Sequence, residues 1–417
     1  MVSNIQKKDI VQKAALKAWV DNGKKGSAEI STGIGKTFLA LHALYEMPLD
    51  WSVEHFFFAE VVDRKLDLIK QIKLYNQIFD RNVLQDYNLH FTTYQSAYKW
   101  VGQKVGLAIF DEVHELCTPE YSKLYYNNHF KAIIGLSATI DKETYYPDIR
   151  RSKLDIINDI APICFTYSLD DGLRDGTSRQ LDVYVIYNQL NNKDKTIKAG
   201  SKTKVFYQTE KAAYDYWNKS FIKNVGQFID YSKGSNESEK AYNSRITKAE
   251  NVKSIKIRNS ASRRSKLLYK LPSKIPIVKE LLKYVKGKTI IFGNDIDALL
   301  EVTKNVVSSR NKPDINNKIR DDFDTNKIQV IGSFKKLKQG ANLADLDNCM
   351  IMSYYSKELH VKQMMGRLRD NGTIGKVFII VTKETQEEVW FDKMFENLNN
   401  LNMIYCNDIE DCINKIK

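Results

Sequence analysis

Paired cysteines, histidines at metal-ligand spacing and long apolar runs are all missing from this chain of 417 residues. Its five cysteines form no C-x-x-C pair, so we expect reduced, mostly buried thiols rather than disulfides or a zinc site. No apolar run approaches the length needed to cross a bilayer, and residues 1–13 are too polar for a secretory signal. We therefore expect no membrane partner and a cytoplasmic protein, in the host cytoplasm if the source is a virus.

The length of the chain predicts two compact domains, because 417 residues exceed one ordinary core. A hydrophobic fraction of 43% supplies enough apolar material for both. We place the first domain at residues 1–165, a linker at 166–180 and the second domain at 181–417. Within the second domain we expect an insertion at about 191–274 and a helical C-terminal tail at about 384–417.

Positive charge is concentrated in one part of the chain. The formal net charge is +13 and the pI is about 9.2, which suggests a polyanionic partner. Residues 191–274 hold 20 Lys and Arg against 7 Asp and Glu, so the rest of the chain is neutral. Aromatic residues are interleaved with this charge, and 251–274 contains no acidic residue. A helical insertion that faces nucleic acid fits this pattern, and so does a solvated, mobile excursion.

A phosphate-binding loop is the strongest local signal. Residues 31–37 read S-T-G-I-G-K-T and stand between a short apolar strand and a helical pattern. Glycines let the backbone N–H groups turn inward, the lysine reaches the outer phosphates, and the final hydroxyl ligates Mg²⁺. The strict pattern would have its first glycine at Ile30, and an ordinary surface turn is the alternative. The expected ATP-binding residues of this loop are Ser31, Thr32, Gly33, Ile34, Gly35, Lys36 and Thr37.

Polar residues follow several apolar strands further along. The apolar run 107–110 is followed by Asp111, Glu112 and His114. The apolar run 133–136 is followed by the triplet Ser137, Ala138 and Thr139. Since ligands bind at the carboxyl edge of an open parallel sheet, Asp111 is expected to hold Mg²⁺ and Glu112 to deprotonate the attacking water. A solvated strand end is the alternative for each motif alone; their joint order over 31–139 predicts a βαβ nucleotide-binding domain.

Other polar residues of the first half fit either a binding role or an ordinary structural one. Gln12, on the helix ahead of the loop, can read an adenine edge through its amide or lie in solvent. Thr93, Gln95 and Ser96 follow the strand 89–94 and can hold a phosphodiester backbone or form an ordinary loop. Arg64 lies near the start of the amphipathic helix 60–79.

The second half repeats the βα rhythm without a glycine-rich loop. We expect strands at 181–187, 289–292, 328–334, 349–355 and 377–381, with helices at 278–285, 295–307 and 358–368. Gly340 and Asn342 follow a strand and can reach a nucleotide. Gln363, Arg367 and Arg369 lie on the last of these helices, where arginines can close on a γ-phosphate; a surface arginine pair is the alternative.

These motifs resemble those of the superfamily-two helicases, the DEAD/DEAH-like group, and are most similar to compact phage-type DNA helicases of the UvsW and XPB-like kind. The likeness covers about 12–165 and 275–385. Asp111 to His114 matches the DExH box, 340–342 matches G-x-[DN], and 363–369 resembles Q-x-x-G-R-x-x-R. The second arginine of that motif would fall at Asp370, with Arg369 one place early.

The resemblance implies two tandem RecA-like α/β domains, with parallel sheets and flanking helices, that bind ATP between them and nucleic acid across both. The implied activity is an ATP-dependent helicase or translocase, acting on single-stranded or branched DNA rather than RNA. Gln12 would lie on the adenine side, and Arg367 and then Arg369 would be arginine fingers. His114, Gln363 and 137–139 would couple hydrolysis to movement. The expected nucleic-acid contacts are Arg64, Thr93, Gln95, Ser96, Arg263 and Arg264.

Two other functions fit the same residues. One is a motor that translocates on duplex without separating strands, as in restriction or remodelling machines. The other is a nucleic-acid clamp switched by ATP binding alone, although the catalytic residues Lys36, Asp111, Glu112 and Arg367 argue against it. No heptad pattern is visible, so a monomer is the default.

Overall fold

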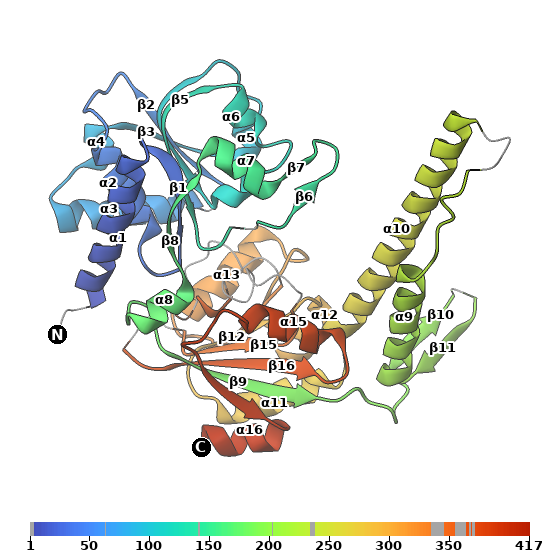
Figure 1. The fold of residues 1–417 in the computed structure, drawn as a ribbon. Coiled ribbons are helices and arrows are strands. Elements are labelled where there is room, and N and C mark those ends of the chain that lie inside the picture. The colour runs from blue at the N-terminus through green and yellow to red at the C-terminus, as the bar shows by residue number, and fades with distance from the viewer. Residues whose placement is uncertain are drawn as a thin grey trace.

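The computed structural model describes residues 4–62, 64–140, 142–201, 203–233, 238–334, 346–354, 364–366, 368 and 372–417. Two parallel sheets with helices on both faces dominate it, one built from each half of the chain (Figure 1). This is the tandem α/β arrangement that the sequence predicts.

The first sheet has six parallel strands in the order β3-β2-β4-β5-β1-β8. Its strands are β1 (Lys25–Ile30), β2 (Glu54–Ala59), β3 (Asn88–Thr93), β4 (Lys104–Asp111), β5 (His129–Ser137) and β8 (Ile163–Tyr167). Its helices are α1 (Asn4–Asp21), α2 (Lys36–Tyr45), α3 (Arg64–Phe79), α4 (Val83–Asp86), α5 (Tyr94–Ala97), η1 (Val113–Glu115), α6 (Lys123–Tyr126) and α7 (Lys153–Ile160). A small antiparallel pair, β6 (Tyr145–Tyr146) and β7 (Arg151–Ser152), stands beside it.

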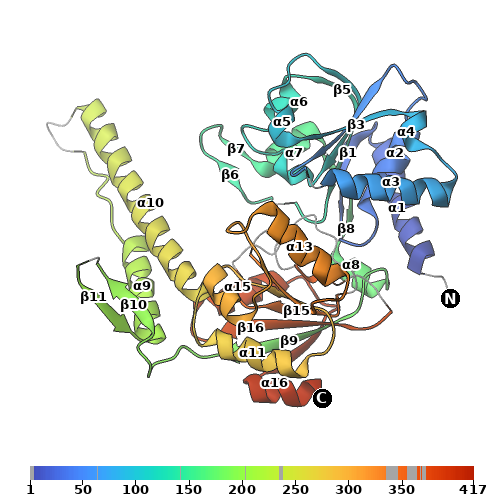
Figure 2. The same cartoon turned by 180° about the vertical axis from the view of Figure 1, so that it is seen from behind.

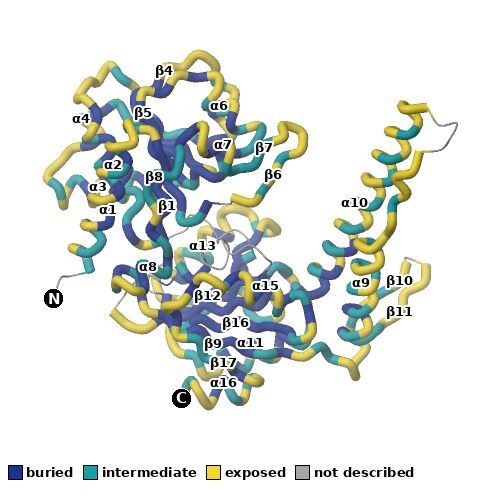
Figure 3. Tube along the Cα trace, viewed as in Figure 1, coloured by how far each residue is buried: buried dark blue, intermediate teal, exposed yellow. Residues whose placement is uncertain are grey.

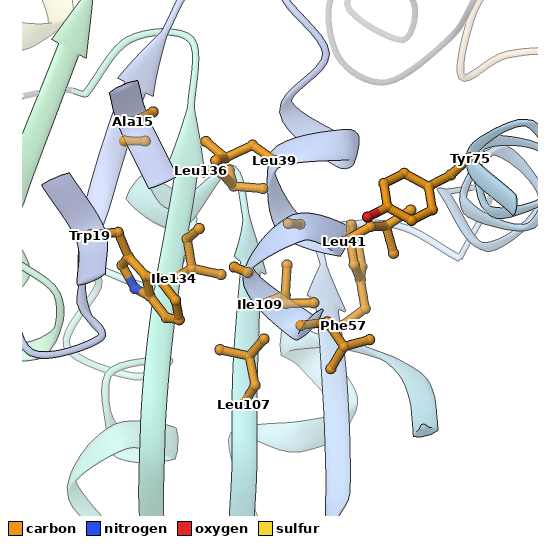
Figure 4. Close-up of a cluster of buried hydrophobic side chains, with 14 of the residues drawn as sticks. Ala15, Trp19, Leu39, Leu41, Phe57, Tyr75, Leu107, Ile109, Ile134 and Leu136 are labelled. Carbon is orange, nitrogen blue, oxygen red and sulfur yellow. The ribbon is translucent and has the colours of Figure 1, made fainter. Parts of the chain in front are cut away.

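Both faces of this sheet are buried, which explains its continuous apolar runs. On one face, Phe57 and Ile109 pack with α1, α2 and α3, and Figure 4 shows Leu39 and Leu41 of α2 in that layer. On the other face, the adjacent residue Phe110 packs with α7. Neighbouring residues point to opposite faces of a strand, so a buried strand needs apolar side chains at every position.

The second sheet has seven parallel strands in the order β13-β14-β12-β15-β16-β9-β17. Its strands are β9 (Leu181–Asn188), β12 (Thr289–Phe292), β13 (Val306–Val307), β14 (Val330–Ser333), β15 (Asn348–Ile351), β16 (Gly375–Thr382) and β17 (Asn402–Cys406). The helices α8 (Leu169–Arg174), α13 (Pro313–Asp324) and α15 (Gln386–Phe395) pack on one face. On the other are α11 (Lys274–Tyr284), α12 (Ile296–Val302) and α16 (Ile409–Ile416).

The insertion projects from one side of the second sheet (Figures 1 and 2). It contains the antiparallel hairpin β10 (Ile197–Gly200) and β11 (Val205–Gln208), followed by α9 (Glu210–Val225) and the long helix α10 (Glu239–Tyr269). Figure 3 shows α10 largely exposed away from its base. The expectation of a mainly helical insertion is confirmed.

Three sequence expectations about elements are corrected. The helix expected over 295–307 ends at Val302, because the two following valines form the edge strand β13. The C-terminal tail is not all helical, since β17 joins the sheet beside β9. The linker contains α8, whose Leu169 and Leu173 pack in the second core. Most of the helix expected over 358–368 lies outside the described residues.

Candidate functional site

The phosphate loop connects the end of β1 to the start of α2. Gly33 and Gly35 have φ angles of 90° and 96°, a region that residues with a Cβ atom rarely adopt. A Cβ atom at Gly35 would lie 2.5 Å from Nε2 of Gln12, whereas one at Gly33 would meet nothing within 4 Å. Gly35 therefore lets the loop pack closely against Gln12, whereas Gly33 faces open space.

Gln12 lies against this loop from α1. Its Nε2 donates a hydrogen bond of 2.6 Å to the carbonyl oxygen of Ile34, and its side chain is buried. The sequence left an adenine contact and a solvated residue open, and the buried position excludes the solvated alternative. In this structure the amide donor supports the phosphate loop itself.

A buried hydroxyl shows that the loop suits a phosphate. Ser31 is 3% exposed, and its Oγ has no hydrogen-bond partner within the described part of the chain. A buried polar atom without a partner costs free energy, and a phosphate oxygen beside the N-terminus of α2 would satisfy it. The residues of this loop fit the triphosphate of a nucleotide.

Asp111 and Glu112 leave the carboxyl end of β4, next to the phosphate loop. Arg64 of α3 binds Asp111 directly, with its Nε and Nη2 atoms 2.8 Å and 2.7 Å from Oδ2. Burial lowers the pKa of Arg64, but the carboxylates of Asp111, Asp67 and Glu112 together raise it above its usual value. Arg64 is therefore paired with Asp111 in this structure, and its expected contact with a nucleic-acid phosphate stays a prediction.

Glu112 lies at the centre of a network that joins three motifs. Its Oε1 is 3.5 Å from Nζ of Lys36, and its Oε2 accepts a 3.0 Å hydrogen bond from Ser137 Oγ. His114 Nδ1 lies 2.9 Å from the same hydroxyl. Although burial raises the pKa of Glu112, Lys36, His114 and the Ser137 hydroxyl together lower it to about 2. The carboxylate is therefore ionised at neutral pH.

The coupling triplet extends this network toward the second domain. Ser137 Oγ also lies 2.8 Å from the Thr139 carbonyl oxygen, so its one hydrogen can serve either Glu112 or Thr139. Ala138 and Thr139 line a cavity of about 100 Å³ that also reaches Leu169, a residue that packs in the second core. The other residues that line it are Glu29, Ser31, Thr32, Thr166, Ser168 and Leu169. A change at Glu112 can therefore reach the junction between the halves through one hydroxyl.

A larger cavity of about 210 Å³ brings the two halves together at the phosphate loop. The first half contributes Lys8, Thr32 and Gly33. The second half contributes Arg179, among others, and Met365, Gly366 and Leu368 from the expected arginine helix. Residues on both sides of position 367 thus face the phosphate loop.

Five expected site residues lie outside the described residues, and nothing further is said of their positions: Gly340, Asn342, Gln363, Arg367 and Arg369.

The expected nucleic-acid contacts have mixed outcomes. Gln95 and Ser96 are exposed, whereas Thr93 is buried and its hydroxyl caps α5 through the Ser96 backbone N–H. Arg263 is exposed and stacks on the Trp217 ring at 4.9 Å.

Arg264 is a correction. It is 7% exposed, and its guanidinium donates to Asn218 Oδ1 at 2.7 Å and to Gln386 Oε1 at 2.9 Å. This arginine holds α10 against α9 and α15. Because its guanidinium is buried in these contacts, it is not placed to bind nucleic acid.

Glu29 and Arg179 were missed by the sequence reading. Glu29, in β1, accepts a hydrogen bond from the Ile140 backbone N–H at 2.8 Å and pairs with Lys142 at 3.0 Å. Arg179 is 4% exposed and donates to the Thr373 and Leu346 carbonyl oxygens beside the interdomain cavity. A carboxylate between the apolar residues Ala28 and Ile30 was the available signal for Glu29; Arg179 had none.

A Mg²⁺ ion fits this site only together with a nucleotide. No group of three or more His, Cys, Asp or Glu side chains that could hold a metal occurs among the described residues. Mg²⁺ is commonly held by one or two protein oxygens plus substrate phosphates. Thr37 and Asp111 are the protein oxygens available for it.

Comparison with known proteins found one matching family model and a similar relative. The family model described as "Type III restriction enzyme, res subunit" (ResIII) matches residues 7–142. The DNA 3'-5' translocase XPB2 of Sulfurisphaera tokodaii is 25% identical over 393 residues, which cover 90% of this chain and 82% of the relative.

Solved structures share the fold at low identity. Dbp5 of S. cerevisiae bound to RNA and ADP BeF3 has a TM-score of 0.58 and 10% identity, covering 100% of this chain and 97% of its own. The ATP-dependent Type ISP restriction-modification enzyme LlaBIII bound to DNA has a TM-score of 0.56 and 12% identity. The match covers 98% of this chain but only 33% of LlaBIII. The solved structures show that the chain shares their fold, while the family model and the translocase show what its sequence is similar to.

Proposed function

We propose that the chain is an ATP-dependent motor that moves along nucleic acid, DNA rather than RNA, and separates or remodels its strands. The match to the ResIII family and the relative named as a DNA 3'-5' translocase support DNA as the substrate. Single-stranded or branched DNA, a monomeric state and a cytoplasmic location belong to this proposal as sequence-based expectations. Within the described residues, no helix has the length and apolar character that a membrane span requires.

The observation that carries the proposal is the cavity between the phosphate loop and the second domain. Thr32 and Gly33 line it from one side, and Gly366 and Leu368 line it from the other. A nucleotide phosphate held by the loop would therefore lie beside Gly366 and Leu368. Closure of the second domain on a bound nucleotide is the movement that such a motor needs.

In the first domain, each residue has a chemical task. Lys36 holds the outer phosphates, and Thr37 and Asp111 hold Mg²⁺, which neutralises charge on the phosphates. Glu112 orients the attacking water and accepts its proton. His114 and Ser137 contact Glu112 and transmit changes in its protonation to the domain junction. In this proposal 111–114 is the DExH box and Gln12 supports both the loop and the adenine.

In the second domain, the proposal relies on residues beyond the described part of the chain. Gly340 and Asn342 contact the nucleotide, Gln363 couples the domains, and Arg367 stabilises the charge on the transferred phosphoryl group. Arg369 is proposed as a weaker second finger, because it is one place early in the motif.

The boundary between the domains is proposed at Ser168. Tyr167 packs in the first core and Leu169 packs in the second, so the chain crosses between them at this one residue. Ser168 is the N-cap of α8 and forms a capping box with Asp171. The capping box fixes the direction in which the chain enters the second domain.

Two alternatives keep the same fold. A duplex translocase that does not separate strands would hydrolyse ATP equally well, and the restriction-type family match is compatible with it. An ATP-switched clamp would bind ATP without turnover. The 3.0 Å contact of Glu112 with Ser137 and its ionised state make hydrolysis the better-supported activity.

The test measures ATP turnover by the full chain with single-stranded, duplex, forked and RNA–DNA hybrid substrates, alongside a strand-displacement assay. We expect DNA to stimulate turnover and forked DNA to be unwound. Turnover that ignores every nucleic acid would contradict the motor. Stimulation without displacement would favour the duplex translocase, and binding without turnover would favour the clamp.

A further inference from the structure

The insertion contains a cavity of about 710 Å³ between its hairpin and its two helices, away from the nucleotide site. Figures 1 and 2 show β10 and β11 standing beside α9. The volume lies within the range of about 300 to 1,000 Å³ that is common for ligand sites. We call this cavity the insertion groove. The residues that line it are Ile197, Lys198, Ala199, Gly200, Phe206, Gln208, Tyr216, Trp217, Arg263, Lys266, Leu267 and Lys270.

Backbone geometry explains why these residues meet. In the hairpin, Ala199 pairs with Phe206 and Ile197 pairs with Gln208, so these four side chains share one face of the ribbon. On α10 the lining positions are 263, 266, 267 and 270, which is the spacing of a single helix face. The groove is therefore the space between one face of the hairpin and one face of the helix pair.

The groove combines exposed aromatic rings with positive charge. Phe206 and Tyr216 are 51% and 61% exposed, although aromatic rings of this size are usually buried well. Its three cations on α10, Arg263, Lys266 and Lys270, form no ion pair with any described acidic residue, and no acidic side chain lines the groove. Such a surface is complementary to a ligand that is both planar and anionic.

At the wall of the groove, the Trp217 ring already stacks with an arginine and contacts a tyrosine ring. The Arg263 guanidinium lies 4.9 Å from the centroid of the Trp217 ring, and the Tyr216 and Trp217 rings meet edge to face at 4.8 Å. Leu267, 4% exposed, supplies an apolar residue between the cations on α10. Bases stack on aromatic rings and on arginine planes, while lysines beside them hold phosphates.

We propose that the insertion groove binds a segment of single-stranded nucleic acid, with bases stacked against Phe206 and Tyr216 and phosphates held by Lys266, Lys270 and their neighbours. This inference deepens the proposed function and rests on it. The insertion then binds the strand at a site of its own, separate from the nucleotide cavity between the domains. An acidic protein segment is the competing occupant, but it would not need the exposed rings.

The first experiment tests the rings in the full chain without nucleotide. A fluorescein-labelled oligothymidylate is titrated with wild type and with the double variant Phe206→Ala/Tyr216→Ala, and binding is followed by anisotropy. Each of the two lost stacking contacts should weaken binding by about 5- to 150-fold. The matched control is Tyr207→Ala/Phe228→Ala, whose rings are exposed but do not line the groove. Equal affinity of wild type and the groove variant, or equal weakening by the control, would overturn the proposal.

The second experiment tests the cations by salt dependence. Lys266→Ala/Lys270→Ala should reduce the slope of log K against log salt by about 0.7 for each lost phosphate contact. Lys240→Ala/Lys248→Ala, exposed lysines near the other end of α10, should leave the slope unchanged. An unchanged slope in the groove variant would overturn the proposal.

Photocrosslinking locates the strand directly. An oligonucleotide that carries 5-iododeoxyuridine should crosslink to Phe206, Tyr216 or Trp217 on ultraviolet irradiation, as identified by peptide mapping. Crosslinks found only elsewhere would overturn the proposal, as would competition by polyglutamate without any groove crosslink. Wild-type ATP turnover with the same oligonucleotide is measured in parallel. If turnover is not stimulated, the proposed motor fails while the groove is still judged by the crosslinks.

Discussion

The Glu112 carboxylate lies between the Lys36 ammonium and the Ser137 hydroxyl, which makes its chemistry testable at one residue. We expect Glu112→Gln to keep nucleotide affinity, because Lys36 and Asp111 remain. Turnover should fall by about a hundredfold to ten-thousandfold, since the amide cannot accept a proton from water. Single-turnover hydrolysis and nucleotide titration measure the two effects.

The control for Glu112 is Glu115→Gln, on the same turn. Glu115 lies 3.2 Å from the other nitrogen of His114, and within the described part of the chain it forms no ion pair or hydrogen bond with Lys36 or Ser137. We expect a much smaller loss of turnover from this change. Equal losses in the two variants would mean that orientation of His114, rather than base chemistry at Glu112, limits the reaction.

The Arg64 contact with Asp111 predicts competition between an arginine and a metal ion. In the structure the guanidinium occupies Oδ2 of the proposed Mg²⁺ ligand. Arg64→Ala should therefore lower the Mg²⁺ concentration needed for half-maximal turnover, by roughly 5- to 150-fold for a coupling of ordinary size. DNA stimulation should shrink if DNA acts by drawing Arg64 away. Asp67→Asn, which alters only a 3.5 Å contact of Arg64, should change both little. An unchanged Mg²⁺ dependence in Arg64→Ala would contradict the competition.

His55 predicts a loss of stability in acid. Its ring is buried, its Nδ1 accepts a hydrogen bond from the Leu107 backbone N–H, and its Nε2 has no partner among the described residues. Burial lowers its pKa from 6.5 to about 4. The neutral ring therefore stabilises the fold above pH 6.5, and this contribution of about 2 to 3 kcal/mol disappears as the pH falls toward 4. His55→Asn keeps an acceptor without titrating, so calorimetric unfolding near neutral pH and near pH 4 should show a smaller acid loss. An equal acid loss in the variant would exclude His55 as the cause.

Single residues show where sequence reasoning ends. The sequence order of Lys36, Asp111, Glu112 and Ser137 was enough to predict that they meet, because each follows a strand of one parallel sheet. Arg263 and Arg264 have the same chemistry and adjacent positions, yet one is exposed and the other is buried. The partners of Arg264 are 46 and 122 residues away, and no local pattern contains them.

At the scale of elements, strands buried on both faces were the easiest to predict. Each is a short, continuous apolar run that ends in polar residues, as 107–110 is. The two strands missed in the second sheet, β13 and β17, are its edges. Edge strands need fewer apolar residues, and β13 has only two, so their neighbours in the sheet rather than their own sequence decide their structure.

The insertion is anchored at its base by one buried carboxylate. Glu210, fully buried at the start of α9, accepts hydrogen bonds from the backbone N–H of Asn191 at 2.9 Å and of Ser273 at 2.8 Å. These two residues are where the chain enters and leaves the insertion. Glu210→Gln replaces one acceptor by a donor that faces an N–H, which should cost about 1 to 3 kcal/mol.

Hydrogen exchange measures that loss where it occurs. The amides of Asn191 and Ser273 should exchange faster in Glu210→Gln, while those of β4 in the first domain should not change. The matched control is Glu239→Gln at the start of α10, where the carboxylate pairs with Lys233 on the surface. An exposed pair is worth at most about 1 kcal/mol, so little change is expected there. Protection that is the same in Glu210→Gln and wild type would rule out this anchor.

At the scale of the whole molecule, two cores meet across a single residue and share two cavities. Tyr167 belongs to the first core, yet its hydroxyl lies 2.9 Å from Thr177 Oγ1 and 3.1 Å from Asp175 Oδ2 beyond the crossing. Lys7 of α1 also donates to the Asp175 carbonyl oxygen at 2.8 Å. Polar contacts of this kind between the halves suit domains that change their relative position during a cycle.

The last prediction concerns the arginine that the second domain is proposed to supply. Arg367→Ala should reduce turnover roughly a thousandfold with little change in ATP affinity, because the arginine acts on charge that develops in the transition state. Arg369→Ala should cost less, since it departs from the motif by one place. If Arg367 and Glu112 act on the same step, combining Arg367→Ala with Glu112→Gln should slow single-turnover hydrolysis far less than the product of the two effects. Wild-type turnover in Arg367→Ala would mean that the nucleotide is not shared between the domains, and the proposed motor would then lack its means of coupling hydrolysis to closure.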